Sequence, residues 1–446
     1  MTFDEARHLL ARSSFGGTPD DIEALTRLSY AEAVDRLLNG SRQQPCTAPP
    51  AWVDGPPPDF RARRNADASM RQVLRAQRRE QGLELKGWWY GELLSTDSPV
   101  TERLTLFWHN HFTSSLEKVR WPALLYRQNL LLRQHALGNF RTLLHAIAKD
   151  PAMILYLDGQ TNRTGNPNEN FARELLELFT LGEGYYSEQD VKESARAFTG
   201  WMVERRSDRF RFNARQHDHG VKTFLGRSGT FDGEAILDIL LQQPRLAVHI
   251  TEKLWRAFVS ETPDKSEVQR LAALFRERDY AIRPLLYGLL TCRHFREARG
   301  RGTLVKSPVE LIVGTVRLFH ILLRDTQWLA RVGRRLGQDL FDPPNVKGWP
   351  GGNAWITAST LLARQQFLQR LLRGQDMAAE VSKERPMEPM PGAKWPAWLH
   401  GPASAAGWEK IIRTLLPLEP VYSPPETTEV HHRVQRLVLD PVYQLQ

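Results

Sequence analysis

Residues 167–182 read PNENFARELLELFTLG, and the spacing of apolar residues in this stretch decides the fold class. At about 100° per residue, Phe171, Leu175 and Phe179 fall on one face of a helix. The Asn, Pro and Glu residues at the beginning are typical of a helix start, and Gly182 is a typical helix end. The stretch therefore predicts an amphipathic α-helix that turns one apolar face toward a core.

The same start and stop signals recur along most of the chain. Ser98, Ser187 and Ser307 each precede a helical pattern, and two of them are followed directly by proline. Only residues 209–225 contain segments that alternate as strands do, and we expect these two segments to pair. The sequence therefore predicts a mainly α protein: a compact multi-helix body with one small β-hairpin and a Gly/Pro/Trp-rich loop.

Two proline-rich segments divide the chain, because proline favours extended backbone and interrupts helices. No fixed-period repeat is present, so a solenoid is not expected. The predicted parts are N-terminal helices at 1–44, a Pro-rich linker at 45–65, a main helical domain at 66–375, a Pro/Met-rich linker at 376–402 and a C-terminal segment at 403–446 that packs on the body.

The composition is that of a globular protein without a disulfide framework. The 446 residues are 41% apolar and 25% charged, and no apolar run reaches the ~18–20 residues of a membrane helix. Cys46 and Cys292 are too few for a cysteine-based zinc site, so a metal would need His and carboxylate ligands. The N-terminus has no apolar signal segment, so we expect a cytoplasmic protein, or an exported one if the chain lacks its export signal.

The chain has a formal charge of +9 and one especially dense basic stretch. The stretch begins with RARR at 61–64 and continues through Arg71, Arg75, Arg78 and Arg79. Such a stretch can bind phosphate groups or can be the solvated face of a helix. No helix-turn-helix, zinc-finger or RRM pattern accompanies it, so we do not expect nucleic acid as a partner.

Long motifs occur in a specific order along about nine tenths of the chain. The motifs are FWHNHF at 107–112, YLD at 156–158, PNENFAREL at 167–175, ELFTLG at 177–182, AFTGW at 197–201, His217-Asp218 with Gly220 and Lys222, KSPVE at 306–310, PPNVKGWP at 343–350 and DPVYQL at 440–445. In these motifs the chain resembles the eighteen-hundred family of domains of unknown function, many of whose members look exported. The resemblance implies no activity, cofactor or site residue, so the chemistry has to be argued from the residues.

Three polar residues share one side of the 167–181 helix. Asn170, Glu174 and Glu177 fall within a ~60° arc, as the groups of an acid–base or metal site would. The alternative is the solvated face of an amphipathic helix, with Arg173 one turn from Glu177. Glu174 and Glu177 are our candidate catalytic carboxylates.

A second group lies around the FWHNHF motif. Glu102 and His109 lie within ~20° of one another on a helix, whereas His111 points nearly the opposite way unless the helix ends near Asn110. These three residues are candidate metal ligands, and His109 is also a candidate catalytic residue. The alternative is that both histidines are hydrogen-bonded residues of the core.

His217 and Asp218 lie at the tip of the predicted hairpin. Loops that a rigid scaffold positions often carry functional residues, so we include both as candidate metal ligands. The alternative is structural, because an Asp-His-Gly sequence favours a turn.

The loop at 345–355 reads NVKGWPGGNAW. Tryptophan between glycines can offer an exposed flat face to a sugar ring, so Lys347, Trp349 and Trp355 are candidate substrate-binding residues together with Asn170. The alternative is a packed loop that covers the end of a helical bundle.

These candidates favour a hydrolase or lyase that acts on a polymer such as a glycan or other polysaccharide. In this interpretation Glu174 and Glu177 act as acid and base, with His109 or a divalent metal assisting. The chain lacks dinucleotide, Walker, nucleophile-elbow and zinc-helix motifs. The alternatives are a metal-dependent oxidoreductase and a non-enzymatic scaffold or binding protein. We also predict that one pocket holds Glu102, His109, Glu174, Glu177 and His217.

Overall fold

Side-chain caps begin several helices where the sequence predicts them. Ser187 and Ser307 each accept a hydrogen bond from the N–H three residues later, and an acidic side chain bonds back to the serine N–H. Ser98 differs, because its hydroxyl donates to the carbonyl of Gly40 at 2.9 Å instead of capping its own helix. All three helices therefore begin where the sequence predicts, but only Ser187 and Ser307 cap them with their side chains, whereas the Ser98 hydroxyl joins two segments.

The computed structural model describes residues 1–56, 67–204, 207–323, 325–373, 396–399, 405–422 and 429–446. Within these residues the protein is mainly α-helical, as predicted. Residues 57–65 of the first predicted linker and residues 376–395 and 400–402 of the second lie outside the described residues, as does the basic run at 61–64.

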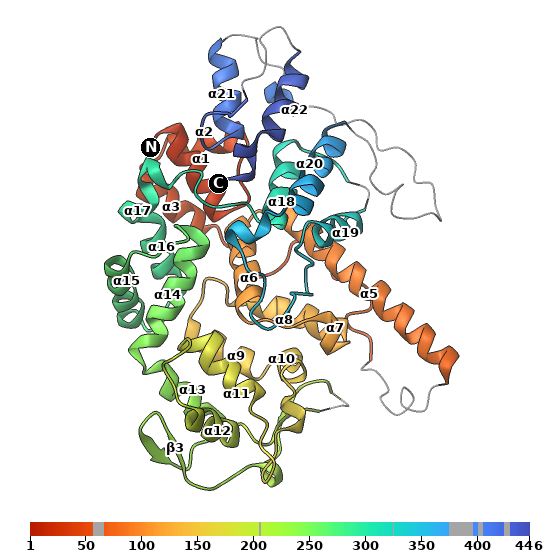
Figure 1. Cartoon of the computed structure of the whole chain (residues 1–446), viewed down its shortest axis with the longest axis vertical. Helices are drawn as coiled ribbons and strands as arrows, with labels where there is room; N and C mark the ends of the chain where they lie inside the picture. The colour runs from red at the N-terminus through yellow and green to blue at the C-terminus, as the bar shows by residue number, and fades with distance from the viewer. Residues whose placement is uncertain (57–66, 205–206, 324, 374–395, 400–404, 423–428) are drawn as a thin grey trace.

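Helices of the N-terminal half surround a central pair. They are α1 (Phe3–Ser13), α2 (Pro19–Thr26), α3 (Tyr30–Asn39), α5 (Ala68–Ser95), α6 (Pro99–His111), α7 (Leu116–Val119), α8 (Pro122–Gln134), α9 (Phe140–Ala148), α10 (Pro151–Tyr156), the short η1 (Gly159–Thr161), α11 (Asn170–Glu174), η2 (Leu175–Thr180) and α12 (Glu188–Ala197). Of these, α6 and α8 pack on one another in the middle of the molecule (Figure 1).

The remaining helices follow a short β region. They are α13 (Gly233–Leu241), α14 (Pro244–Phe258), α15 (Lys265–Glu277), α16 (Ile282–Thr291), α17 (Arg293–Arg296), α18 (Pro308–Leu318), α19 (Gln327–Arg335), α20 (Ala358–Arg373), α21 (Ala405–Leu415) and α22 (Val430–Leu439). Single 3₁₀ turns are η3 (Ala214–Gln216), η4 (Ala298–Gly300), η5 (Gly352–Trp355), η7 (Ala397–Leu399) and η8 (Pro441–Gln444).

The β region contains two antiparallel pairs, and its pairing differs from the predicted one. Strand β2 (Phe210–Phe212) pairs with β1 (Trp201–Val203), and β3 (Lys222–Phe224) pairs with β4 (Arg227–Gly229). Both segments expected to be strands are strands, but they do not pair with each other. Each pairs with a three-residue neighbour that is too short to show an alternating pattern.

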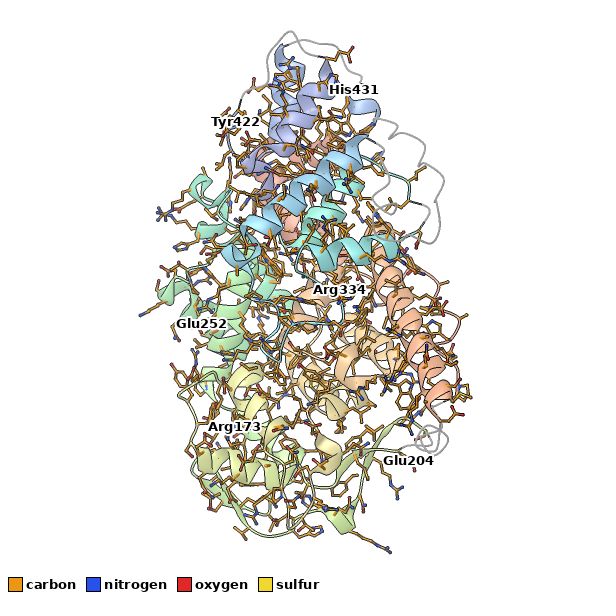
Figure 2. All side chains as sticks on the ribbon, turned by 45° about the vertical axis from the view of Figure 1, so that its right-hand side comes forward. Arg173, Glu204, Glu252, Arg334, Tyr422 and His431 are labelled. Carbon is orange, nitrogen blue, oxygen red and sulfur yellow. The ribbon has the colours of Figure 1, made fainter. Side chains whose placement is uncertain are left out.

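The two ends of the described chain lie close together. An ion pair joins Lys410 of α21 to Glu23 of α2, and Arg413 contacts Asp4 of α1 at 3.0 Å. The backbone of Leu445 forms an isolated antiparallel bridge with Val305. The C-terminal segment therefore packs on α1 and α2 (Figure 1), and side chains fill the space between the ribbons (Figure 2).

Helix α5 leaves the body at its N-terminal end. Residues 68–81 are mostly exposed, whereas Leu85, Trp89 and Leu93 are fully buried. The described arginines of the basic stretch lie on this half, which extends away from the other helices (Figure 1): Arg71, Arg75, Arg78 and Arg79.

Candidate functional site

The helix that carries the candidate carboxylates changes its geometry between them. α11 ends at Glu174, and Leu175–Thr180 form a π-helical turn, η2. The Leu181 N–H donates to the carbonyl of Leu176, five residues back, at 2.9 Å. π-turns are rare and occur frequently at functional sites. The regular spacing of 100° per residue therefore does not hold between Glu174 and Glu177.

One face of α14 holds the end of this π-turn. His249 Nε2 and Lys253 Nζ donate to the Leu178 carbonyl at 3.1 and 2.9 Å, and Arg245 Nε donates to the Leu181 carbonyl at 2.9 Å. These three side chains are four residues apart, so they lie on one side of α14. Donors at the C-terminal end of a helix satisfy its free carbonyls, which explains why the turn is held in place.

Glu174 and Glu177 form a half-buried pair with few partners. Burial and then the charge of Glu177 raise the pKa of Glu174 above its usual range, and Lys347 opposes this effect. Glu177 lies 3.7 Å from Lys347 Nζ and accepts a hydrogen bond from the Tyr186 hydroxyl at 3.3 Å. The pair therefore combines a carboxyl group that holds its proton more tightly with a carboxylate beside a cation.

Asn170 is bound in a different network from the two carboxylates. Its amide donates to Asp158 at 3.1 Å, and Asp158 also pairs with Lys118 at 2.8 Å. The three polar residues that the sequence places on one helix face are therefore divided between two sets of contacts.

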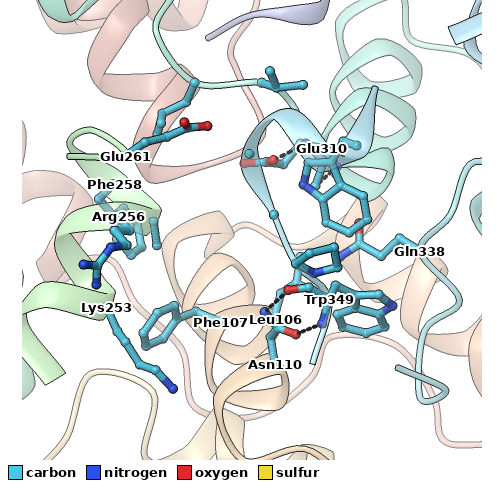
Figure 3. A pocket seen from close by; sticks show the side chains of 18 of the residues that line it. Leu106, Phe107, Asn110, Lys253, Arg256, Phe258, Glu261, Glu310, Gln338 and Trp349 are labelled. Atoms are coloured by element: carbon cyan, nitrogen blue, oxygen red, sulfur yellow. Dashed lines mark hydrogen bonds between the residues drawn. The ribbon is translucent and has the colours of Figure 1, made fainter. Parts of the chain in front are cut away.

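The loop at 345–355 is fastened to α6 by one side chain. Asn110 Oδ1 accepts the Trp349 N–H at 2.7 Å, and its Nδ2 donates to the Trp349 carbonyl at 3.3 Å (Figure 3). Gly348 has a φ of 83°, and a Cβ there would lie 2.2 Å from Asn110 Oδ1. Only glycine fits this position, which brings the loop backbone onto the helix.

A cavity of about 490 Å³ lies between α6, α14 and this loop. Lys347, Trp349 and Trp355 all line it. The two tryptophans are only 4% and 7% exposed, so the prediction of exposed flat faces was wrong: they are walls packed into the body. Glu261 extends toward the cavity (Figure 3) and has no ion pair among the described residues. Lys347 contacts both the cavity and Glu177, so the cavity adjoins the carboxylate pair.

The two histidines of α6 do not converge. The helix continues through His111, so the two side chains point to different sides. His109 is 1% exposed among the rings of Trp89, Phe341 and Trp349, and burial lowers its pKa to about 3. His111 accepts from Lys253 Nζ at 3.0 Å. His109 is therefore a neutral core side chain outside the lining of the cavity.

Glu102 is part of a buried ion pair. Its carboxylate accepts from Arg133 at 2.5 and 2.9 Å and from the Trp89 indole at 3.0 Å. Both Glu102 and Arg133 have side chains that are 1% exposed. All of these groups are satisfied within the core, so the carboxylate has a structural role.

His217 and Asp218 also have structural partners. His217 Nδ1 donates to the Thr199 carbonyl at 2.9 Å, and Arg196 binds Asp218 at 2.8 and 3.1 Å. The hydrogen bonds from Arg196 lower the pKa of Asp218 to about 2. These contacts fix the turn between the two β pairs.

The predicted common pocket is therefore not formed. The candidate metal ligands bind different partners in different parts of the molecule. In the part of the chain that the structure describes, no group of three or more His, Cys, Asp or Glu side chains could hold a metal ion. Only Glu174 and Glu177 of the five proposed pocket residues lie together beside the cavity. For Glu102 and Asp218 the correction follows from the partners, since Arg133 and Arg196 bind the carboxylates that a metal would need.

Sequence reasoning missed Lys253, Asn110 and Glu261. Lys253 has the i, i+4, i+8 spacing with His249 and Arg245, which was a visible signal for a shared helix face. Asn110 stood between the two histidines, and nothing in its neighbours indicated a partner at 349. Glu261 follows the end of α14 without any pattern that indicates a site.

The model of the family described as "Protein of unknown function (DUF1800)" matches residues 8–444. No curated protein matches the chain, and no solved structure matches it. Among the described residues, no helix has both the length and the apolar character needed to cross a membrane.

Proposed function

We propose, on the premise that this chain belongs to the DUF1800 family of proteins of unknown function, that it is a hydrolase acting on a polar polymer such as a glycan. Glu174 is the general acid and Glu177 the general base. The cavity beside them holds the part of the polymer next to the bond that is cut.

One observation carries this proposal: a half-buried pair of unequal carboxyl groups, which Lys347 connects to the wall of the cavity. Burial and a like charge raise the pKa of Glu174, while Glu177 has Lys347 and Tyr186 as partners. Pairs whose environments separate their pKa values are typical of acid–base catalysis. Lys347 connects the pair to the cavity, whose polar wall groups Asn353 and Gln338 suit sugar hydroxyls.

The reaction needs two proton transfers and one water molecule. Glu174 donates its proton to the leaving oxygen as the bond to carbon breaks. Glu177 takes a proton from water, whose oxygen forms the new bond to the same carbon. Exchange of one proton with solvent then restores both carboxyl groups.

A binding protein without catalysis is the second candidate, and a specific observation favours it. Trp349 and Trp355 are buried, the Glu102 and Asp218 carboxylates are held by Arg133 and Arg196, and His217 Nδ1 is bound to the Thr199 carbonyl. In this alternative the cavity binds a saccharide, and Glu174 and Glu177 belong to its polar rim.

The test compares Glu174→Gln and Glu177→Gln with Glu169→Gln in an assay of reducing-end release from a panel of polysaccharides. Glu169 pairs with Arg173 on the same segment at 3.1 Å, so it is a matched control for a lost carboxylate. We expect each of the first two changes to lower the rate by about 10²–10⁴ and the control to keep it. Saccharide binding by calorimetry without cleavage by the unaltered chain would establish the binding alternative.

A further inference from the structure

A second, smaller cavity of about 50 Å³ lies behind the first, between α1, α18 and α21. Two residues, Glu310 and Gln446, line both cavities and form their common wall, with the Gln446 amide donating to Glu310 at 2.8 Å. On the far side of this wall, Arg7 and Lys306 line the small cavity.

Arg7 is a buried cation that has no hydrogen-bond or ion-pair partner in the part of the chain that the structure describes. The residue is 7% exposed, and its Nη2 has no hydrogen-bond partner. No ion pair or hydrogen bond of its guanidinium occurs within the described residues. Asp4 is one turn away on α1, but it pairs with Arg413 and Arg301 at the surface. The positive charge of Arg7 is therefore not offset by direct contact.

The other charges around the cavity do not compensate Arg7. Lys306 Nζ donates to the Tyr443 carbonyl at 2.7 Å and lies over the Tyr443 ring, so its contacts are neutral. Glu310 forms an ion pair with Arg103 and accepts a hydrogen bond from the Ser307 N–H at 2.6 Å, so its carboxylate is already paired with another cation.

Two further buried arginines increase the excess of positive charge. Arg12 donates to the Gly300 carbonyl at 2.8 Å, and Arg364 to the Lys306 carbonyl at 2.9 Å, and both residues are fully buried. Their partners are neutral, and Glu310 is the carboxylate whose charge reaches both. Removing a charge from water is unfavourable unless an opposite charge compensates it. A bound anion would supply that compensation.

We propose that the small cavity binds an oxyanion of the phosphate or sulfate type between Arg7 and Lys306. Its volume exceeds the 10–15 Å³ or so that a single water needs, which leaves room for a tetrahedral ion. Arginine presents a planar set of donors that matches oxyanions. Burial and then the charge of Arg7 lower the pKa of Lys306 to about 7, so Lys306 adds a point charge in its protonated form, which an anion beside it favours. The Gln446 side chain on the shared wall connects this site to the larger cavity.

The experiment measures the Tm of the full chain while inorganic phosphate or sulfate replaces chloride at constant ionic strength. The variants are Arg7→Met and the control Arg293→Met, whose side chain is 86% exposed. We expect a saturable rise on the order of 3–5 °C at about 100 times Kd for the unaltered chain and the control. Arg7→Met should show no rise, and without oxyanion its Tm should equal or exceed that of the unaltered chain.

Calorimetry should find one phosphate or sulfate per chain, and comparison of the two titrations identifies the preferred ion. No saturable rise with the unaltered chain, or an equal rise with Arg7→Met, would overturn the proposal. If Arg7→Met does not fold by circular dichroism, Lys306→Gln takes its place with the same expectation. The outcome is independent of polymer hydrolysis, because neither substitution touches Glu174 or Glu177.

Discussion

The core around Glu102 and the rim around Glu174 both contain carboxylates that the sequence marked as candidate site residues. Glu102 receives bonds from Arg133 and Trp89 and is closed off from solvent. Glu174 is half-buried, and the charge of its neighbour Glu177 acts against its ionisation. The partners of a carboxylate, more than its position on a helix face, therefore distinguish a structural role from a chemical one.

Glu102→Gln should have the largest effect on stability. The change leaves Arg133 buried without a compensating charge, which typically costs about 3–5 kcal/mol. Chemical denaturation with circular dichroism measures the free energy of unfolding. A loss below about 1 kcal/mol would contradict the structural role of the pair.

The double variant Glu102→Gln with Arg133→Met sharpens this result. Removing both charges also removes the uncompensated cation, so it should recover part of the lost stability. An additive loss would mean that the two residues do not act as a pair.

Asp218→Asn should have an intermediate effect. The pKa of Asp218 falls from 3.8 to about 2 because Arg196 binds its carboxylate, which corresponds to about 2 kcal/mol at neutral pH. A lowered carboxyl pKa gives stability that is present above pH 3.8 and lost as the pH falls through about 2. The free energy of unfolding of the unaltered chain and of the Asp218→Asn variant is measured from pH 7 downward. The difference between the two should therefore be constant above pH 5 and should shrink below pH 4. A difference independent of pH would assign the effect to another cause.

Glu174→Gln should have the smallest effect, within about 0.5 kcal/mol or slightly stabilising. The raised pKa of Glu174 means that its ionisation opposes folding, so its contribution declines as the pH rises from 4.5 through the folded pKa. The glutamine variant should therefore gain stability relative to the unaltered chain as the pH rises. Thermal melts between pH 4 and 8 measure this gain, and a loss of 1–3 kcal/mol would instead indicate a structural hydrogen-bond network.

Local signals predicted much of the fold. Ser187 and Ser307 cap helices as expected, since a capping box depends on residues only three positions apart. The pairing of the strands could not be predicted in the same way. β2 and β3 each pair with a three-residue strand, and such a short segment shows no alternation of apolar and polar residues that would predict it.

The candidate site could be predicted only in part, because its contacts join residues that are far apart in the sequence. Lys347 and Glu177 are 170 residues apart in the sequence. The hydrogen bonds of Asn110 to Trp349 hold the 345–355 loop where Lys347 reaches Glu177, and no local sequence pattern indicates that contact. Helical spacing placed Glu102 and His109 on one face, but it could not identify Arg133 as the partner of Glu102. The domain boundaries remain predictions.

Because Leu175–Thr180 form a π-turn, the number of residues in this segment determines where the residues after it lie. The Leu181 N–H donates to the carbonyl five residues back, whereas in an α-helix each N–H donates to the carbonyl four residues back. The π-turn therefore contains one residue more than an α-helical turn. Deleting one residue inside it would restore four-residue spacing and rotate the following residues by about 100°. The Leu178 carbonyl would then leave the donors of α14 even though no functional side chain had been replaced. In a set of aligned relatives, a single gap in this segment would therefore mark the loss of the arrangement more reliably than a change of residue type.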